Sequence, residues 1–319
     1  MLKGHKEKII CGKIIGAAII FLTFSISEAF SCACGCGVLN VGTSSLIPNC
    51  EGGIAFLQYD YLNQSRNWQG NSKSDANLNE DKQIKSRVVT AGMQYMFNRN
   101  WGAAIRVPYF NRQVKMTEID DDGNEIAHSN KVNSIGDIRI NGIYSGFFAD
   151  MSTGITFGLK LPTGQSNAKS FDSRDLQIGT GSTDWLLGAY HFTKIDNAGK
   201  LNWFVQGNWQ HAFIVHNGYR PGDEVSAATG ISYNAGSIFG IKKIAPILQI
   251  TGSRKTHDSN WAADQENSGY THAYFAPAIE LTFGKIRTYA DIEFPFYQKT
   301  NGNQLVPSVI YKVILGYNF

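Results

Sequence analysis

The feature that most constrains this chain is a two-residue alternation of apolar and polar side chains that recurs about twelve times from Gly53 to the end. In the first repeat one face carries Ala55, Leu57, Tyr59 and Tyr61, and the other carries Phe56, Gln58 and Asp60. A period of two belongs to β-strands whose two faces meet different surroundings. After the first thirty residues no apolar run approaches the roughly 20 residues of a membrane-crossing helix. A helical transporter is therefore excluded, and any membrane crossing must use strands.

The connections between the repeats are as informative as the repeats themselves. We predict long connections at 66–85, 116–134 and 163–181, alternating with short ones at 98–100 and 148–151. Long loops on one side and short turns on the other are typical of bacterial outer-membrane barrels, whose even strand number returns both termini to the periplasm. The predicted strands are 53–65, 86–97, 101–115, 135–147, 152–162, 182–193, 201–214, 224–234, 243–254, 270–283, 286–297 and 308–319. The expected fold is all-β, a closed antiparallel transmembrane β-barrel of about 12 strands over 53–319.

The last predicted strand supports the same fold independently. One of its faces carries Tyr311, Val313, Leu315, Tyr317 and the terminal Phe319. This ending resembles the C-terminal signature by which outer-membrane barrels are recognised for assembly. It predicts two partners, the barrel-assembly machinery through Phe319 and outer-membrane lipid along the apolar face. An open sheet with such faces would aggregate, whereas closure removes the edge.

The N-terminus has the composition of a secretory signal. Four lysines precede an apolar run over 14–26, and small residues follow at Ser27 and Ala29. The apolar run is too short to cross a bilayer as a helix. We predict cleavage after Ala29, so that 1–29 is a signal peptide and the mature chain is exported to the outer membrane of the cell.

Residues 30–52 form a cysteine-rich segment, expected to lie in the periplasm or to plug the barrel. Export implies an oxidising environment, which favours disulfides. A soft metal site is a second interpretation, although structural zinc sites usually add a distant second pair of ligands. A lipid anchor on the first cysteine is a third. The disulfide candidates are Cys32, Cys34, Cys36 and Cys50.

Overall charge points away from nucleic acid. Lys and Arg total 29 and Asp and Glu total 26, and removal of the lysine-rich signal brings the two numbers close together. A nearly neutral chain has no general attraction for a polyanion. We therefore predict no nucleic-acid partner.

Strand parity assigns charged and aromatic side chains to the lumen. The charges are of mixed sign, so they fit either a conduction route without strong ion selectivity or an ion-pair network that fills the barrel. The expected inward charges are Asp60, Arg106, Asp137, Arg139, Lys160, Asp184, Glu280, Arg287, Asp291, Glu293 and Lys312. The expected inward aromatics, either contacts for an aromatic solute or filler, are Phe56, Phe110, Phe204 and Tyr274. The expected lipid-facing aromatics include Trp185, Trp203, Trp209, Tyr289 and Phe294.

Three stretches carry a family resemblance. They are Ser134-Ile135-Gly136-Asp137-Ile138-Arg139, Gly158-Leu159-Lys160-Leu161-Pro162-Thr163-Gly164 and Gly179-Thr180-Gly181-Ser182-Thr183-Asp184. They resemble the outer-membrane transporter family associated with the meta-pathway of phenol degradation, by motif over the middle third and by layout over most of the mature chain. The resemblance implies a barrel that carries small hydrophobic or aromatic solutes across the outer membrane, with no enzymatic activity and no cofactor.

Two alternatives to a channel remain at this stage. A structural or surface-interaction barrel with a closed lumen would show its long loops outward. An outer-membrane lipid hydrolase would use His216, in a His-Asn-Gly turn, together with Ser226 on the following strand. No third group to orient the imidazole is identifiable, so no catalytic residues are predicted.

Overall fold

A computed structural model describes residues 31–32, 46–48, 51–75, 79, 81–119, 125–169 and 174–319. The predicted signal peptide, 1–29, lies outside these ranges. In chain order the elements are β1 (Ser31–Cys32), β2 (Gly52–Gly70), β3 (Ser72–Lys73), β4 (Asp81–Met96), β5 (Trp101–Ile119), β6 (Glu125–Ile135), β7 (Ile138–Tyr144), β8 (Thr153–Leu161), the short 3-10 helix η3 (Arg174–Leu176), β9 (Ser182–Lys194), β10 (Leu201–Val215), β11 (Glu224–Tyr233), β12 (Lys243–Lys255), β13 (Ser268–Phe283) and β14 (Ile286–Asn318). Within the described ranges, no helix has the length and apolarity needed to cross a membrane.

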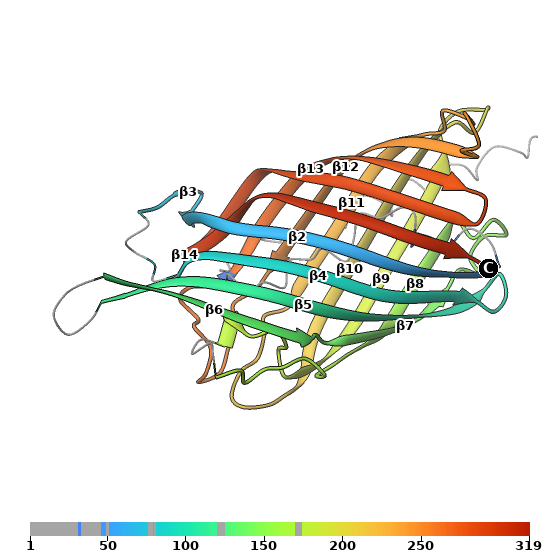
Figure 1. Cartoon of the computed structure of the whole chain (residues 1–319). Coiled ribbons are helices and arrows are strands. Elements are labelled where there is room, and N and C mark those ends of the chain that lie inside the picture. The colour runs from blue at the N-terminus through green and yellow to red at the C-terminus, as the bar shows by residue number, and fades with distance from the viewer. Residues whose placement is uncertain are drawn as a thin grey trace, which may run out of the picture.

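All the strands belong to one sheet that closes on itself. Neighbours pair antiparallel in the order β13-β12-β11-β10-β9-β8-β7-β5-β4-β2-β14, and β14 returns to pair with β13. Figure 1 shows the resulting barrel, with the C-terminus at one end and β3 and the β5–β6 hairpin at the other. The predicted closed antiparallel barrel is confirmed.

The long β14 contributes two arms to the wall. It pairs with β13 through residues 286–300 and with β2 through residues 300–318. The Asn318 N–H donates to the Lys285 carbonyl at 2.8 Å, so the two ends of β14 lie side by side. The chain reverses near Gly302, whose φ of 53° is the left-handed conformation that favours glycine. The strand number depends on how three features are counted. If the two arms of β14 count as two strands, β6 and β7 count as one interrupted strand, and the two-residue β1 and β3 are left out, the described sheet agrees with the predicted number of about 12.

The last residue joins the sheet at its seam with β2. Phe319 and Gly53 exchange two backbone hydrogen bonds of 2.9 and 3.0 Å. The Phe319 ring stacks on Tyr95 of β4, with centroids 6.1 Å apart. The terminal aromatic residue therefore completes the barrel at the end where β2 begins. We call this the C-terminal end and the opposite one the loop end.

The two faces of the wall have the alternation expected from the sequence. On β2, Leu57 is 54% exposed while its neighbour Phe56 is 5% exposed, and the pattern continues along the strand. Gly92 of β4 pairs with Phe56 and lies under its ring, where a Cβ would come within 2.2 Å of the ring. Tyr289 corrects one expectation: it is buried inside, because it shares the parity of the inward Asp291. The tyrosine was wrongly grouped with the lipid-facing aromatics.

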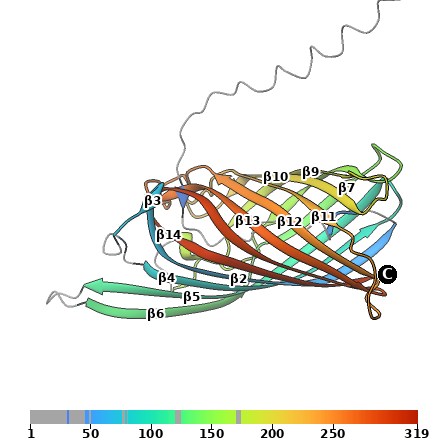
Figure 2. The ribbon, with the colours of Figure 1, turned by 90° about the horizontal axis from the view of Figure 1, so that it is seen from above.

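Several strands extend further toward the loop end than predicted. Most of 66–85 and 116–134, expected to be loops, belongs to β2, β4, β5 and β6, and the β5–β6 hairpin projects beyond the rest of the barrel (Figure 2). In the outer part of β6, residues 126–129 are exposed on both faces of the strand, so this stretch lacks the apolar–polar contrast that marks a strand in a membrane. Ile84 and Val132, elsewhere in the extensions, are buried. The strand predicted at 135–147 corresponds to β7, which begins at Ile138, and Ile135 is the last residue of β6. At the break between the two strands the Gly136 N–H donates to the Pro108 carbonyl at 2.7 Å. Pro108 thus lies beside the break between β6 and β7, whereas Pro246 and Pro277 lie within the continuous β12–β13 register.

Candidate functional site in the barrel lumen

In the part of the chain that the structure describes, three cavities follow one another along the lumen. The outer cavity, nearest the loop end, includes Phe110 and Ile178 and measures ≈ 660 Å³ of empty space. The central cavity measures ≈ 970 Å³, part of it open to solvent, and shares Arg106, Arg139, Gln210 and Glu224 with the outer one. The terminal cavity, ≈ 650 Å³, is lined by residues near the C-terminal end and shares Ile47 with the central cavity. The series leads from one half of the barrel into the other.

An inward-folded loop covers the outer cavity. In the segment between β8 and β9, the side chains of Ala168, Leu176 and Ile178 form a buried apolar cluster with inward residues of β4, β5, β6 and β14. Arg112 of β5 holds this segment: its guanidinium donates to the carbonyls of Leu176 and Gln177, each at 2.9 Å. We call residues 162–169 and 174–181 the cap. A solute arriving from the loop end meets the cap first.

A piece of the N-terminal segment separates the central and terminal cavities. Leu46 and Ile47 are buried in an apolar cluster that includes Ile143, Tyr190 and Phe204 of the wall. Of the two predicted locations for 30–52, periplasm or plug, these described residues lie inside the barrel. Cys34, Cys36, Cys50 and the side chain of Cys32 lie outside the described residues, so their predicted state remains a prediction.

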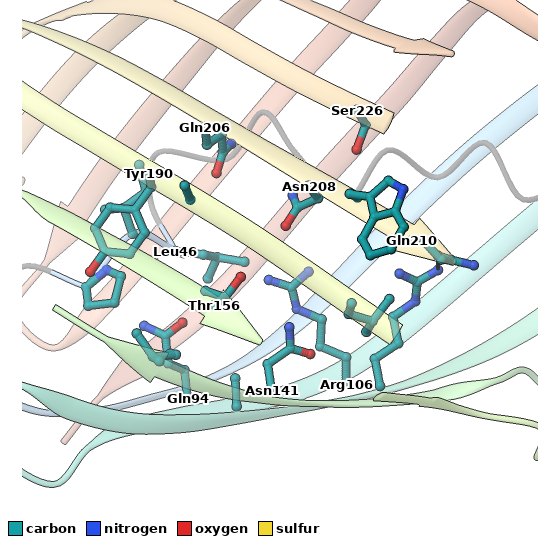
Figure 3. Close-up of a pocket in the computed structure, with 18 of the residues that line it drawn as sticks. Leu46, Gln94, Arg106, Asn141, Thr156, Tyr190, Gln206, Asn208, Gln210 and Ser226 are labelled. Atoms are coloured by element: carbon teal, nitrogen blue, oxygen red, sulfur yellow. Dashed lines mark hydrogen bonds between the residues drawn. The ribbon is translucent and has the colours of Figure 1, made fainter. Parts of the chain in front are cut away.

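The lining of the central cavity combines neutral amides with apolar surface. Gln94 of β4, Asn141 of β7, and Gln206 and Asn208 of β10 project into it, and Tyr190 and Leu46 supply apolar surface (Figure 3). Amides both donate and accept hydrogen bonds without carrying charge. A surface of this kind suits a small solute with an apolar body and one polar group.

The three sequence motifs meet at one buried lysine. Lys160 Nζ lies 3.1 Å from Asp137 Oδ2 and 2.9 Å from Asp184 Oδ2. It also donates to the Thr180 and Ser182 hydroxyls. Asp137 in turn accepts from the Gly164 N–H at 3.0 Å, at the start of the cap. We call Asp137, Lys160, Thr180, Ser182 and Asp184 the Lys160 cluster; it ties the break between β6 and β7 to both ends of the cap.

A second buried lysine lies across the lumen. Lys312 Nζ is 3.1 Å from Glu293 Oε1 and 3.9 Å from Asp291 Oδ2. Asp291 also accepts from the Tyr289 hydroxyl at 2.7 Å, and Asp60 pairs with Lys312 in the β2–β14 register. We call Asp60, Asp291, Glu293 and Lys312 the Lys312 cluster. Lys160 and Lys312 are both almost fully buried, although Asp137, Lys160 and Thr180 border the outer cavity.

Two arginines have no such partners. Arg106 of β5 and Arg139 of β7 are opposite each other in the sheet register, and both line the outer and central cavities. Arg139 donates to Gln210 Oε1 at 3.0 Å. Among the described residues neither arginine has a carboxylate within 4.0 Å. Both arginines are partly exposed, and they lie between the outer and central cavities.

Comparison with known proteins establishes the fold. No family model matches this sequence, and no curated protein matches it. Among solved structures, an outer-membrane channel from Pseudomonas putida F1 superposes with a TM-score of 0.65 at 12% identity, covering 88% of this chain and 100% of that one. The β-domain of the Bordetella autotransporter BrkA superposes with a TM-score of 0.51 at 9% identity, covering 84% of this chain and 100% of that one.

The chain has the fold of an outer-membrane β-barrel. At these identities the likeness is one of fold, so the lumen residues of this barrel must be interpreted from their own surroundings.

The predicted lumen residues divide into two groups. Those that line one of the three cavities are Arg106, Phe110, Asp137, Arg139, Lys160, Phe204, Glu280 and Arg287. Those that face inward but pack within the wall are Phe56, Asp60, Asp184, Tyr274, Asp291, Glu293 and Lys312. Lys243 and Glu280 form an ion pair of 2.8 Å in the terminal cavity. Of the inward aromatics, only Phe110 and Phe204 of the predicted set meet a cavity.

Sequence reasoning missed the residues that give the central cavity its character. Leu46, Ile47 and Pro48 lie in the segment before the first predicted strand, where no apolar–polar alternation indicates that they reach the lumen. Tyr190 and Glu224 have the strand parity of inward residues, so the same parity argument that placed the predicted lumen residues could have placed these two. Strand parity identifies which side chains point inward; it does not show which of them leave space.

The two residues of the hydrolase alternative are in different environments. His216 is exposed in the turn after β10, where Asn217 and Gly218 both have positive φ. Ser226 is buried on β11 and lines the central cavity. The structure gives no hydrogen bond between them within the described residues. The turn thus has a conformational reason for its Asn-Gly sequence.

Proposed function

We propose that this protein is an outer-membrane channel that passes small hydrophobic or aromatic solutes through its lumen. The observation that carries the proposal is the series of outer, central and terminal cavities inside a closed barrel. The cap covers the outer cavity, and Leu46–Pro48 lies between the central and terminal cavities. Both are short segments that are not part of the barrel sheet. A solute would move from cavity to cavity as these segments shift.

The lining supports the solute class. Phe110 in the outer cavity, Tyr190 in the central one and Phe204 in the terminal one provide an aromatic side chain at each stage. Aromatic faces and edges favour contact with another ring. The Pseudomonas putida F1 protein of the same fold is described as an outer-membrane channel, which agrees with a transport role for this chain.

The outer surface supports the location. Side chains on the outward face, among them Leu57, Val313 and Leu315, are about half exposed although apolar. A continuous apolar face on a closed barrel is stable in a bilayer. We include in the proposal export through a cleaved signal peptide, contact with outer-membrane lipid, and recognition of Phe319 by the assembly machinery.

Uptake into proteoliposomes tests the channel. The full chain is reconstituted, and the entry of labelled phenol or toluene is compared with that into empty vesicles. Ser226→Trp places an indole in the central cavity and is expected to slow entry strongly. Ala227→Trp, on the adjacent lipid-facing position, is the matched control and should leave entry unchanged. Equal entry through a correctly folded Ser226→Trp barrel would contradict the proposal.

A closed, structural barrel is the second candidate. The cap and Leu46–Pro48 favour it, because both occupy the lumen. Conductance of the purified protein in planar bilayers, measured beside aromatic uptake, separates the two functions. Absence of both conductance and uptake would favour the structural barrel. A lipid hydrolase requires an activity that His216→Ala abolishes.

A further inference from the structure

The arginine pair is energetically unusual for a barrel wall. Like charges directly opposite each other on neighbouring strands destabilise a sheet. Arg106 and Arg139 are in this arrangement, on β5 and β7. Every lysine of the two lysine clusters has a carboxylate within 4.0 Å, whereas the described residues provide none for these arginines. No carboxylate of the described residues lies within ion-pair distance to offset their mutual repulsion.

Both guanidinium groups border empty space. Arg106 extends into the cavity bordered by Asn141 and Asn208 (Figure 3). Among the described contacts Arg106 has no hydrogen-bond partner, and Arg139 has one, Gln210 Oε1. A guanidinium carries five N–H donors in a planar fork that matches a carboxylate. Most of the donors of this pair therefore remain available to a solute in the cavity.

The surrounding carboxylates are already engaged. Glu224, on the facing strand β11, accepts from the Tyr270 hydroxyl at 3.1 Å. Asp60 acts on Arg106 only at longer range and accepts two hydrogen bonds from Gln58. These two acids moderate the positive potential without forming a bidentate pair with either arginine. A carboxylate bound between the guanidinium groups would relieve their repulsion.

We infer that the arginine pair is a binding site for the carboxylate of a small aromatic or hydrophobic acid, with the ring in the central cavity. The inference rests on the proposed channel function and specifies its solute class. Tyr190, Leu46 and Ile143 would contact the ring, and Arg106 and Arg139 the carboxylate. The amides beside them complete the hydrogen bonding of the carboxylate oxygens.

Benzoate and benzyl alcohol test this site because they share a ring and differ in charge. Binding of each to the full chain in detergent is measured by saturation-transfer NMR titration. The parent protein should bind benzoate about tenfold more tightly than benzyl alcohol, a difference of about 1.4 kcal/mol. Arg106→Gln combined with Arg139→Gln should abolish this preference, because it weakens benzoate binding far more than benzyl alcohol binding. Arg106→Lys combined with Arg139→Lys should keep part of the preference for benzoate, because lysine keeps the positive charge but lacks the planar guanidinium that pairs with a carboxylate.

Arg87→Gln is the matched control. Arg87 is exposed on the outer face of β4, and its loss removes one arginine without touching a cavity. Heat-modifiable migration verifies the fold of each variant. Equal affinity for the two ligands in the parent, or benzoate binding that survives the double Gln variant, would overturn the inference. If benzyl alcohol still enters proteoliposomes in that case, the channel proposal stands; if neither ligand enters, both fail.

Discussion

The lysine clusters and the arginine pair occupy the same lumen and have opposite relations to it. Lys160 and Lys312 are each less than 3% exposed and each contacts carboxylates of neighbouring strands. Arg106 and Arg139 lie opposite each other on neighbouring strands and border the cavities. Neither has a carboxylate partner among the described residues. The comparison teaches that charge on an inner wall has two uses. A charge with a complete set of partners holds strands together, and a charge with an incomplete set remains available for a solute.

The largest effect that would sharpen this contrast is expected at Lys160. Lys160→Met leaves Asp137 and Asp184 buried without their cation, and breaking a buried ion pair in this way costs about 3–5 kcal/mol. Denaturant unfolding of the barrel in detergent should show a clearly lower midpoint. Lys200→Met, in the exposed turn before β10, is the control and should leave the midpoint unchanged. A Lys160→Met midpoint equal to that of the parent would refute the structural role of the cluster.

A smaller loss of stability is expected at Arg112, which, like Lys160 and Lys312, is buried and has hydrogen-bond partners. Arg112→Met deprives the carbonyls of Leu176 and Gln177 of their donor, and each buried group left unsatisfied costs about 1–3 kcal/mol. Hydrogen exchange over 174–181 should accelerate, and aromatic uptake should rise if the cap limits it. Arg112→Lys, which keeps a donor, should give an intermediate exchange rate. Unchanged exchange in the Met variant would show that the cap is held by its apolar contacts alone.

A pH-dependent effect is expected at the loop end, outside the membrane-spanning part. Burial alone would raise the pKa of Asp258, but Lys255 at 2.7 Å and hydrogen bonds from Gly222 and Tyr219 lower it below its ordinary value of 3.8. A depressed pKa stabilises the folded state above the unfolded pKa, and that stability is lost as pH falls through the folded pKa.

Exchange or proteolysis of 216–223 and 256–267 should therefore accelerate as pH falls below about 4. Asp258→Asn should show the faster rate at neutral pH and lose this pH dependence. A variant whose profile overlays that of the parent would exclude the Lys255–Asp258 pair as the cause.

The smallest effect, opposite in sign, is expected at the arginine pair. Arg106→Gln removes a like-charge contact and should leave stability unchanged or raise it by about 0.2–1 kcal/mol. The same unfolding assay as for Lys160→Met gives the comparison directly. A loss of stability comparable to that of Lys160→Met would remove the distinction between the two kinds of charge.

Strand parity predicted much of the barrel because lipid and lumen impose different chemistry on alternate residues. It failed where that contrast ends. In the outer part of β6, residues 126–129 are exposed on both faces of the strand, and the break at Gly136 coincides with the hydrogen bond from its N–H to the Pro108 carbonyl. Tyr289 was misplaced by treating an aromatic side chain as lipid-facing against the parity of its own strand.

The site was less predictable than the fold. The motifs around Asp137, Lys160 and Asp184 were recognised separately, and their meeting at one lysine depends on how the cap folds back into the barrel. The cavities depend on which inward side chains fall short of filling the lumen. Leu46 and Ile47 reach the lumen from a segment with no strand pattern, so their position is decided by long-range packing alone.

The central claim is that the solute occupies the lumen and not the outer face of the wall. Crystals of the full chain grown with 4-bromobenzoate would locate the ligand through the anomalous signal of bromine. The account predicts bromine in the central cavity near Tyr190, with the carboxylate at Arg106 and Arg139. Bromine confined to the apolar outer groove between Val225 and Thr271 would contradict it.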